Sequence, residues 1–407
     1  MAINKEQNKL NVPHLRFPEF HGEWCVSTIG EQFDLYSGNT PSRLNKEHFE
    51  GNVNWITSGE LKEHYISDTK EKISEDAATA NNLKLLHPGT FVIAIYGLEA
   101  DGVRGTGSIT CKESTISQAC MAFTQKGDVK NEFLYSWYKK HGNIIGIKYA
   151  QGTKQQNLSY DILEKFHIAY PSQDEQDKLI KFISLLDERI ASQSKLIEDL
   201  KKLKSAIIEN VFDDKHSERL QLDNVGSYIR GLTYSSNDVV EHGGTLVMRS
   251  NNIVNGSLLD YNNNVVFVNK QMSAEQQLQN GDIVICMANG SSSLVGKSSF
   301  YDGNWHSPIT VGAFCGIYRS KEPIVKWLFQ TNKYRRYIWN SLQGGNGAIA
   351  NLNGEDILNM SFSIPNAPIK DTCVKMLTSV DSALENNISL CALYTLQKQH
   401  LLRQMFI

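Results

Sequence analysis

Apolar residues recur at every third or fourth position after Pro171, in a stretch that contains neither glycine nor proline as far as Phe212. This spacing predicts one long amphipathic helix. Ser172 and Glu175 at its start are typical of a capping box. About 35 helical residues would reach roughly 52 Å, which is more than the width of a small domain. The apolar stripe consists of Leu179, Ile183, Leu186, Ile190, Ile197, Leu200, Ile207 and Val211.

A second stripe of the same kind ends the chain. It is weaker, because Thr395 and Lys398 occupy positions that an apolar residue would prefer. One long helix cannot bury such a stripe alone, whereas two helices can bury each other's, so we predict that the two pair as a coiled coil. The second stripe consists of Leu377, Val380, Leu384, Ile388, Cys391, Leu402 and Met405.

The segment that leads into each stripe occurs twice. "NLSYDILEKFHIAYP" at 157–171 matches "NLNGEDILNMSFSIP" at 351–365, and "PGTFVIAIYG" at 88–97 matches "NGDIVICMANG" at 280–290. The period is about 194 residues, which is far too long for a solenoid and indicates a duplicated domain. The similarity is strongest at the two ends of each copy and weakest in its middle.

Each copy begins with short strand-like runs that are broken by Gly, Asn, Asp and Ser, which predicts a mixed α/β globule of roughly 150 residues. The clearest strands are "TFVIAIY" and "DIVICM", and helices are predicted near residues 133–140 and 324–339. The connector at 213–222 is short, so the second domain must lie near the far end of the first helix. The second helix follows the second domain and must therefore run back to pair with the first. We therefore predict an α+β fold, with two pseudo-twofold-related α/β domains separated by two long antiparallel helices. The predicted segments are an N-terminal arm (1–22), domain 1 (23–171), helix 1 (172–213), domain 2 (214–365) and helix 2 (366–407).

Composition leaves the class of protein open. Hydrophobic residues make up 41% and charged residues 21%, which is ordinary for globular protein. No run approaches the roughly 20 apolar residues of a membrane span, and the N-terminus lacks the apolar core of a signal peptide, so a cytoplasmic location is expected. The seven cysteines lie far apart without a CxxC pair, which favours buried free thiols. The net charge of −3 does not point to nucleic acid, so any such binding must come from local patches or from a partner.

The sequence contains none of the catalytic motifs below in complete form. "NGSSSLVGKSS" at 289–299 has five residues between Gly290 and Gly296, whereas a phosphate-binding loop requires four between its first Gly and Gly-Lys. The chain has no Pro-Pro for the base-flipping loop of an adenine methyltransferase, no HExxH and no GxSxG. The sequence therefore predicts no catalytic residue and no metal ligand.

With these residues, the chain resembles the specificity subunits of type I restriction-modification systems. The resemblance rests on "NVPHLRFPEF" at 11–20 and on the passage from "QGTKQQNLS" at 151–159 through Pro171 into the long helix. It implies two target-recognition domains that each read one half of a split site in double-stranded DNA, and helices that set the gap and dock two methyltransferase subunits. It also implies that this chain binds no cofactor, because S-adenosylmethionine belongs to the methyltransferase, and ATP and Mg to the motor-nuclease subunits. The chain departs from the pattern at 366–373, where "NAPIKDTC" replaces "SQDEQDKL".

Polar loops at equivalent places in both copies are the candidates for DNA contact, because Asn, Gln, Arg, Ser and Thr can read base edges. Their structural alternative is ordinary solvent exposure. Positively charged candidates for phosphate or guanine are Arg43, Arg104, Lys154, Arg249 and Lys297. The other candidates are Ser37, Asn39, Thr40, Ser42, Thr57, Ser58, Thr153, Gln155, Gln156, Ser250, Asn251, Asn289, Ser291, Gly345 and Asn346.

Partner binding by the helices is assigned to the apolar stripes. Two other readings of the chain stay open: a protein-interaction scaffold that reads no DNA, and a diverged fused methyltransferase. The residues assigned to partner binding are Leu179, Ile183, Leu186, Ile190, Ile197, Leu377, Leu384 and Ile388.

Overall fold

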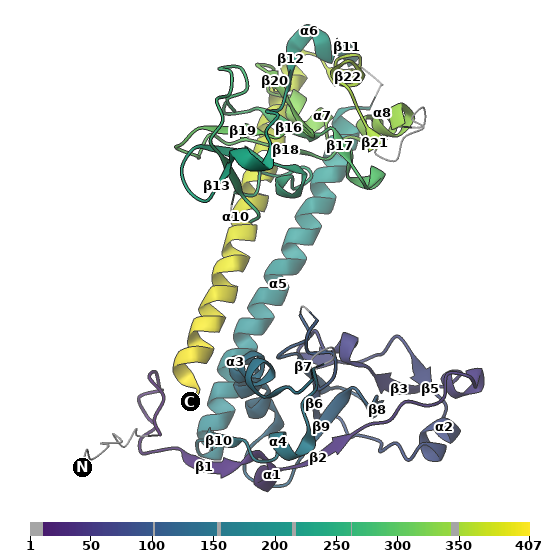
Figure 1. The fold of residues 1–407 in the computed structure, drawn as a ribbon, viewed down its shortest axis with the longest axis vertical. Coiled ribbons are helices and arrows are strands. Elements are labelled where there is room, and N and C mark those ends of the chain that lie inside the picture. Colours follow the sequence, from purple (N-terminus) through teal and green to yellow (C-terminus); the bar gives the residue numbers. More distant parts are fainter. Residues whose placement is uncertain (1–10, 101, 153–155, 214–216, 262, 343–349) are drawn as a thin grey trace. The chain divides into compact units, whose positions relative to one another are not determined.

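The structure is a computed structural model that describes residues 11–100, 102–152, 156–213, 217–261, 263–342 and 350–407. The chain divides into two compact units, residues 1–194 with 389–407 (unit 1) and residues 195–388 (unit 2). The division falls inside both long helices, α5 (Gln173–Val211) and α10 (Ala367–Met405). Each unit therefore contains one globular domain and a part of each long helix (Figure 1).

The globular part of unit 1 is built on two sheets. One has the strand order β2-β9-β6-β7-β4 and the other the order β5-β3-β8, and a separate antiparallel pair, β1 with β10, joins the start of the domain to its end. The strands are β1 (Cys25–Thr28), β2 (Phe33–Ser37), β3 (Val53–Ile56), β4 (Tyr65–Ile66), β5 (Lys72–Ile73), β6 (Phe91–Ala94), β7 (Gly107–Thr110), β8 (Ser114–Ile116), β9 (Cys120–Gln125) and β10 (His167–Tyr170). The helices are α1 (Ile29–Gln32), α2 (Glu75–Ala80), α3 (Asn131–Tyr149) and α4 (Tyr160–Leu163).

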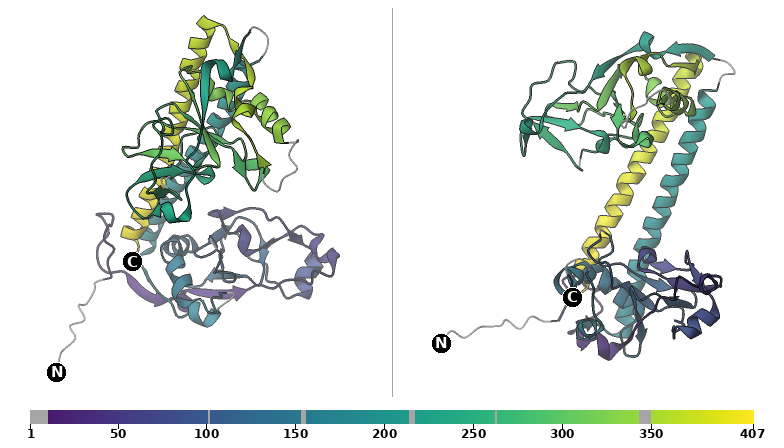
Figure 2. Two further views of the ribbon diagram at one scale, coloured as in Figure 1. Left: turned by 45° about the horizontal axis from the view of Figure 1, so that its top comes forward. Right: turned by 45° about the vertical axis from the view of Figure 1, so that its right-hand side comes forward.

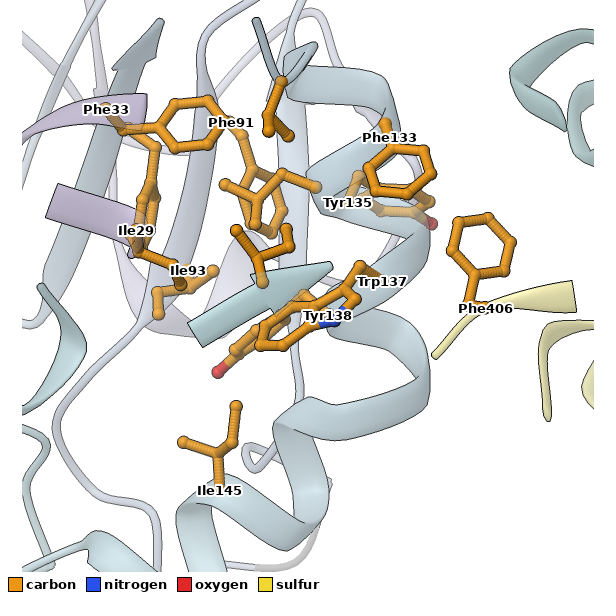
Figure 3. Packing of buried hydrophobic residues seen from close by; sticks show 14 of the residues in the cluster. Ile29, Phe33, Phe91, Ile93, Phe133, Tyr135, Trp137, Tyr138, Ile145 and Phe406 are labelled. Carbon is orange, nitrogen blue, oxygen red and sulfur yellow. The ribbon is translucent and has the colours of Figure 1, made fainter. Parts of the chain in front are cut away.

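Helix α3 covers the larger sheet of unit 1 with its aromatic side chains (Figure 3). The rings of Phe91 and Tyr138 lie 5.7 Å apart between centroids, in an edge-to-face contact typical of aromatic pairs. Phe406, just after α10, reaches the same core, 5.2 Å from the ring of Phe133. The end of the second long helix is therefore anchored in the core of unit 1.

Unit 2 repeats this plan. Its sheets have the orders β12-β20-β16-β18 and β13-β15-β14-β19, and β11 pairs with β22 as β1 does with β10. The strands are β11 (Ser217–Gln221), β12 (Gly226–Arg230), β13 (Val239–Val240), β14 (Thr245–Met248), β15 (Val266–Val268), β16 (Ile283–Cys286), β17 (Ala288–Asn289), β18 (Ser298–Phe300), β19 (Ile309–Val311), β20 (Cys315–Ser320), β21 (Ala350–Asn351) and β22 (Ser361–Pro365). The helices are α6 (Leu222–Val225), α7 (Val325–Leu328), α8 (Asn332–Leu342) and α9 (Gly354–Leu358).

The duplication is visible in strand pairing. Strands β3 and β8 are parallel, with Ile56 opposite Ile116, and β14 and β19 are parallel, with Met248 opposite Val311. The larger sheets share the order β2-β9-β6-β7 and β12-β20-β16-β18, in which each neighbouring pair is antiparallel. The units differ in the other sheet, which has the order β5-β3-β8 in unit 1 and β13-β15-β14-β19 in unit 2.

Within each unit the long helices run antiparallel, side by side (Figures 1 and 2). In unit 1, Leu179 and Ile183 near the start of α5 share a core with Leu402 near the end of α10. In unit 2, Ile208 near the end of α5 shares a core with Leu377 near the start of α10. The α+β class with two long antiparallel helices is thus confirmed. Helix α10 begins at the position equivalent to the start of α5, despite the departure at 366–373.

Three details differ from the sequence-based expectations. The single helix expected near 324–339 is two helices, α7 and α8, because the chain turns between them at Phe329 to Thr331. The thiols are free, but Cys25 and Cys111 are exposed rather than buried. The capping box is half formed: Ser172 Oγ accepts from the Glu175 amide at 3.4 Å, whereas the Glu175 carboxylate is taken by Arg16 at 2.6 and 2.8 Å.

Candidate nucleic-acid interface

In unit 1, three loops meet beyond the carboxyl ends of β3 and β8. Parallel strands end at the same edge of a sheet, so the loops that follow them lie together. The amide of Ser117 donates to Ile56 O at 2.9 Å and ties the loop after β8 to the end of β3. The amide of Ile95 donates to Ala119 O at 2.9 Å and brings in the segment after β6. The amide of Leu98 donates to Gln156 O at 3.1 Å, which adds residues 156–157 as a fourth segment. We call residues 57–60, 95–99, 117–119 and 156–157 the loop cluster of unit 1.

The same hydrogen bonds build the loop cluster of unit 2, which consists of residues 249–252, 287–291, 312–314 and 350–351. The amide of Gly312 donates to Met248 O at 2.9 Å, as Ser117 donates to Ile56. Phe314 O accepts from the amides of Met287 and Ala288 at 2.8 and 3.1 Å, as Ala119 O accepts from Ile95. Two domains with different sequences thus present equivalent loops on one scaffold.

The loops after β3 and β14 are shaped by capping. In unit 1 the Glu60 carboxylate accepts from the Thr57 amide at 2.8 Å, and in unit 2 the Asn252 amide oxygen accepts from the Arg249 amide at 2.9 Å. Asn252 is fully buried and donates to Asp260 O and Asn263 O. Each loop is therefore held from behind, which leaves its outer side chains free to face a ligand.

A hollow of about 570 Å³ opens in the loop cluster of unit 2. Arg249 lines it and donates from Nη2 to Asn264 O at 2.9 Å, while its Nε is buried without a hydrogen-bond partner among the described residues. Such a donor is costly unless something accepts from it. The hollow is lined by Tyr234, Arg249, Ser250, Asn251, Gly312, Ala313, Phe314 and Cys315.

Several predicted DNA-contacting residues come together in these clusters. Thr57, Ser58 and Gln156 lie in that of unit 1, and the unit 2 cluster contains Arg249, Ser250, Asn251, Asn289 and Ser291. The Asn289 side chain donates to Ser250 Oγ at 3.3 Å, so two of the predicted loops touch directly. Ser37 ends β2, and Asn39 O accepts from the Trp55 indole at 3.2 Å, which places the segment that begins there beside β3.

Other candidates lie elsewhere or are already engaged. Arg43 forms a bidentate pair with Glu71 at 2.6 and 2.8 Å, which raises the pKa of the Arg43 guanidinium. Arg104 donates to Leu98 O at 2.5 Å. Lys297 lines a separate, smaller hollow beside α8. The loop that contains Thr40 and Ser42 leads to Arg43. Thr153, Lys154, Gln155, Gly345 and Asn346 lie outside the described residues.

The sequence did not single out Tyr234, Gln118 or Phe314. Phe314 is 66% exposed at the rim of the hollow, and its counterpart in unit 1 is Ala119. Both residues directly precede the buried cysteine that begins β9 or β20, so the internal repeat aligns the two positions. Neither copy has a polar residue there. A search for polar readers passes over it.

Charged clusters join each domain to the long helices. In unit 1, His64 Nε2 lies 2.8 Å from Glu132 Oε2 and its Nδ1 lies 3.6 Å from Asp187 on α5, which in turn pairs with Lys398 on α10. The His64 ring stacks on Tyr135 at 3.9 Å. We call these five residues the His64 cluster.

Protonation in the His64 cluster follows from burial and pairing. Burial disfavours the charged His64 ring, but hydrogen bonds to Asp187 and Glu132 outweigh it and raise the pKa of His64. Burial also opposes ionisation of Asp187, yet His64 and Lys398 lower the pKa of that carboxyl. Nearby, burial lowers the pKa of Lys139 to about 8. The cluster therefore favours a protonated histidine between two carboxylates.

In unit 2, Asp381 on α10 pairs with Lys204 on α5 at 2.7 Å and with Lys326 at 3.0 Å, and accepts from the Trp327 indole at 3.0 Å. We call these four residues the Asp381 cluster. Asp187 and Asp381 hold equivalent places on the two helices, as do Lys204 and Lys398. Lys398 occupies a position of the second stripe where an apolar residue was expected. In the structure it forms an ion pair with Asp187, which accounts for a charged residue at this position.

The long helices carry buried and exposed apolar residues. The protein itself buries Leu179, Ile183, Leu377 and Leu384, and it half-buries Leu186, Ile190 and Ile197. Ile388 is 39% exposed, so the prediction that it lies in a buried seam between the helices is wrong. Side chains that are buried within the protein stabilise its fold, so docking of a partner subunit requires the exposed apolar side chains. The exposed apolar residues of the helices are Leu185, Leu390, Leu393 and Leu396 in unit 1, and Leu196, Leu203, Ile369, Met376 and Ile388 in unit 2.

No cluster of three or more His, Cys, Asp or Glu side chains that the structure describes could hold a metal ion. Nor does any helix in the described ranges combine the length and apolar character needed to cross a membrane.

Comparison with known proteins finds similarity over part of the chain. Residues 21–202 match the family described as type I restriction modification DNA specificity domain. The type I restriction enzyme MjaIX specificity subunit of Methanocaldococcus jannaschii is 28% identical over 196 residues, 47% of this chain and 44% of that protein. The EcoKI specificity subunit of Escherichia coli K12 is 35% identical over 155 residues, 36% of this chain and 31% of that protein. The match thus spans less than half the length of either relative.

Solved structures extend the likeness to the whole fold. The S subunit of a type I restriction-modification system from M. genitalium superposes with a TM-score of 0.61 at 18% identity, over 97% of this chain and 99% of that chain. A chain from a structure of complex assembly and conformational transition of the type I R-M system gives a TM-score of 0.54 at 13% identity, over 94% and 97% of the two chains. The match to the DNA specificity domain family thus covers residues 21–202 of a chain whose fold resembles that of these solved structures. Part of the sequence and the whole fold are thus similar to those of type I restriction-modification specificity subunits.

Proposed function

We propose that the chain is the DNA sequence-specificity subunit of a type I restriction-modification complex. Each globular domain reads one half of a bipartite site in double-stranded DNA through its loop cluster. The observation that carries the proposal is that the two loop clusters are built by equivalent hydrogen bonds yet present different side chains. One scaffold with two sets of readers is what recognition of two different half-sites requires.

The chain itself is non-catalytic in this proposal. Methyl transfer belongs to two methyltransferase subunits that bind S-adenosylmethionine, and ATP- and Mg-dependent cleavage belongs to motor-nuclease subunits. The relatives are named as specificity subunits, which supports this division of labour. The exposed leucines of α5 and α10 supply apolar surface on which the methyltransferase subunits dock.

The helices set the gap between the half-sites. The Asp187–Lys398 and Lys204–Asp381 pairs support this role, because the interval between the two α5 residues equals that between the two α10 residues. Both pairs therefore specify one antiparallel register. A polar pair inside an apolar stripe is a known means of fixing register, because a slipped alignment would bury each charge without its partner.

Exchange of the first domain tests half-site recognition. Residues 23–171 are replaced by the equivalent domain of a related chain, and methylation is mapped in cells that carry the intact system. We expect one half of the methylated sequence to change while the other half and the gap stay constant. An unchanged sequence would favour an interaction scaffold that reads no DNA, and methyl transfer by the purified chain alone would favour a fused methyltransferase.

Lengthening both helices tests the ruler. An insertion of one or two turns near Lys195, matched by one at the facing position of α10, should change the gap and leave both halves intact. The matched insertion preserves both Asp–Lys pairs, so loss of activity by misfolding is avoided. A gap that stays constant would refute the role of the helices as a ruler.

A further inference from the structure

The hollow of unit 2 combines an aromatic side chain with a guanidinium. Phe314 is 66% exposed, and Arg249, which lines the same hollow, has an Nε without a hydrogen-bond partner in the described part of the chain. Single exposed apolar residues are common on protein surfaces, so exposure alone assigns nothing. What sets Phe314 apart is its place among the residues that the sequence had already marked as DNA readers.

The backbone holds Phe314 firmly. Its carbonyl accepts two amides, from Met287 and Ala288, and the next residue, Cys315, is buried at the start of β20. Burial of a Phe side chain is favourable, and most of that gain is not realised at Phe314, which is 66% exposed. The fold thus presents this ring to solvent from a fixed position.

Gly312 also lines the hollow. A Cβ there would make ordinary van der Waals contacts, 3.6 Å from the Tyr234 ring and 3.5 Å from Val247, so the bare backbone leaves room for about one methyl group beside Tyr234. Phe314 and Arg249 line the same hollow, so a group that enters it meets both a phenyl ring and a guanidinium. A base edge in a DNA groove, with one apolar and one polar feature, fits this description.

Unit 1 has no aromatic ring at the equivalent position. The position equivalent to Phe314 is Ala119, whose carbonyl accepts from Ile95 in the same way. The loops after β3 and β14 differ as well, with Thr57 where unit 2 has Arg249. At these two positions the same scaffold thus carries an aromatic and a cationic side chain in one domain and small uncharged side chains in the other.

We propose that Phe314 is a specificity-determining residue of the second domain, which contacts the 5-methyl group of a thymine in the half-site that this domain reads. The 5-methyl is the apolar feature of the major-groove edge, and side chains such as Phe contact it directly. Arg249 supplies the hydrogen-bond donors for the neighbouring base, with guanine as the matching acceptor. This inference rests on the proposed function, because it names how one domain reads its half-site.

The size of the effect follows from one methyl group. Burial of about one CH₂ equivalent contributes about 0.8 kcal/mol, which is roughly a four-fold change in affinity. Replacement of the contacted thymine by uracil removes this methyl and leaves base pairing intact. The wild-type complex should therefore bind the uracil duplex about four-fold more weakly.

The experiment uses the full chain with its methyltransferase subunits and duplexes that carry the mapped target site. Each thymine of the second half-site is replaced singly by uracil, and affinity is measured for wild type, Phe314→Ala, Phe314→Leu and a control, Val239→Ala, which changes an exposed apolar side chain outside the hollow. We expect one uracil position to weaken the wild type and Val239→Ala about four-fold and to leave Phe314→Ala unaffected. Phe314→Leu, which keeps an apolar contact, should retain part of the discrimination.

Three outcomes would overturn the inference. They are a second half-site without any A·T pair, equal sensitivity to uracil in wild type and Phe314→Ala, and equal affinities of these two proteins for the thymine duplex. The proposed function is tested separately by replacing residues 214–365. If that exchange changes the second half-site while Phe314→Ala behaves as wild type, only the inference fails, and if the exchange changes nothing, the proposed function fails.

Discussion

Asp381 is the acidic partner of two lysines in unit 2, and its replacement by alanine should strongly destabilise that unit. The side chains of Asp381 and Lys204 are each 7% exposed, so water cannot replace the lost carboxylate. The Trp327 indole would lose its acceptor as well. Removal of one partner from a buried ion pair costs about 3–5 kcal/mol, because the remaining charge stays buried without compensation.

Calorimetry of the full chain measures this effect. For units of roughly 150–250 residues, 1 kcal/mol shifts the midpoint by about 2–4 °C, so Asp381→Ala should lower the unit 2 transition by about 6–20 °C. Hydrogen exchange in α7 and α10 assigns the transition to unit 2. The matched control is Asp371→Ala, which removes an exposed carboxylate from the same helix and should stay within about 0.5 kcal/mol.

A double variant separates the charge from the packing. Asp381→Leu combined with Lys204→Met replaces the pair by apolar side chains and should recover the part of the lost stability that comes from the unpaired Lys204 charge, because a buried pair often contributes little net free energy over a well-packed apolar pair. The reasoning would be refuted if Asp381→Ala and Asp371→Ala shifted the midpoint equally. It would also be refuted if Asp381→Ala destabilised unit 1 instead.

Other expected outcomes concern unit 1 and the helix surface. Because the pKa of His64 is raised in the folded state, its stabilising contribution is complete below about pH 6.5 and is lost as pH rises through the folded pKa. The difference in unfolding free energy between wild type and His64→Gln should therefore shrink over that pH range. A difference that does not depend on pH would contradict the raised pKa. A Cβ at Gly38 would lie 1.8 Å from Ile116 O, so Gly38→Ala should lower the unfolding free energy in a urea titration by about 1–3 kcal/mol. The control Gly59→Ala has open space around the new Cβ and should be nearly neutral. Similar losses in the two variants would count against the close approach at Gly38. Leu393→Asp places a charge on an exposed part of α10 and should reduce copurification of the methyltransferase subunit without lowering the melting temperature, and full copurification would argue against docking there.

Sequence reasoning located the loops better than it located the residues. Thr57 and Arg249 were found because polar segments recur at equivalent places in the repeat, and both lie in the loop clusters. Arg43 has the right chemistry, but Glu71 already occupies its guanidinium. Phe314 was missed because a search for polar readers cannot weigh an apolar residue whose exposure is set by the strands around it.

The amino-acid order by itself determined the duplicated plan, the α+β class and the two long antiparallel helices. These depend on local periodicity, on repeat spacing and on the short connector, which are properties of the chain read in one dimension. Only the tertiary structure decided which charges meet, such as Asp187 with Lys398 and Lys204 with Asp381, and which loops converge beyond β3 and β14. The physical reason is that these contacts join residues far apart in the sequence, and their distances depend on strand register and helix packing rather than on local pattern.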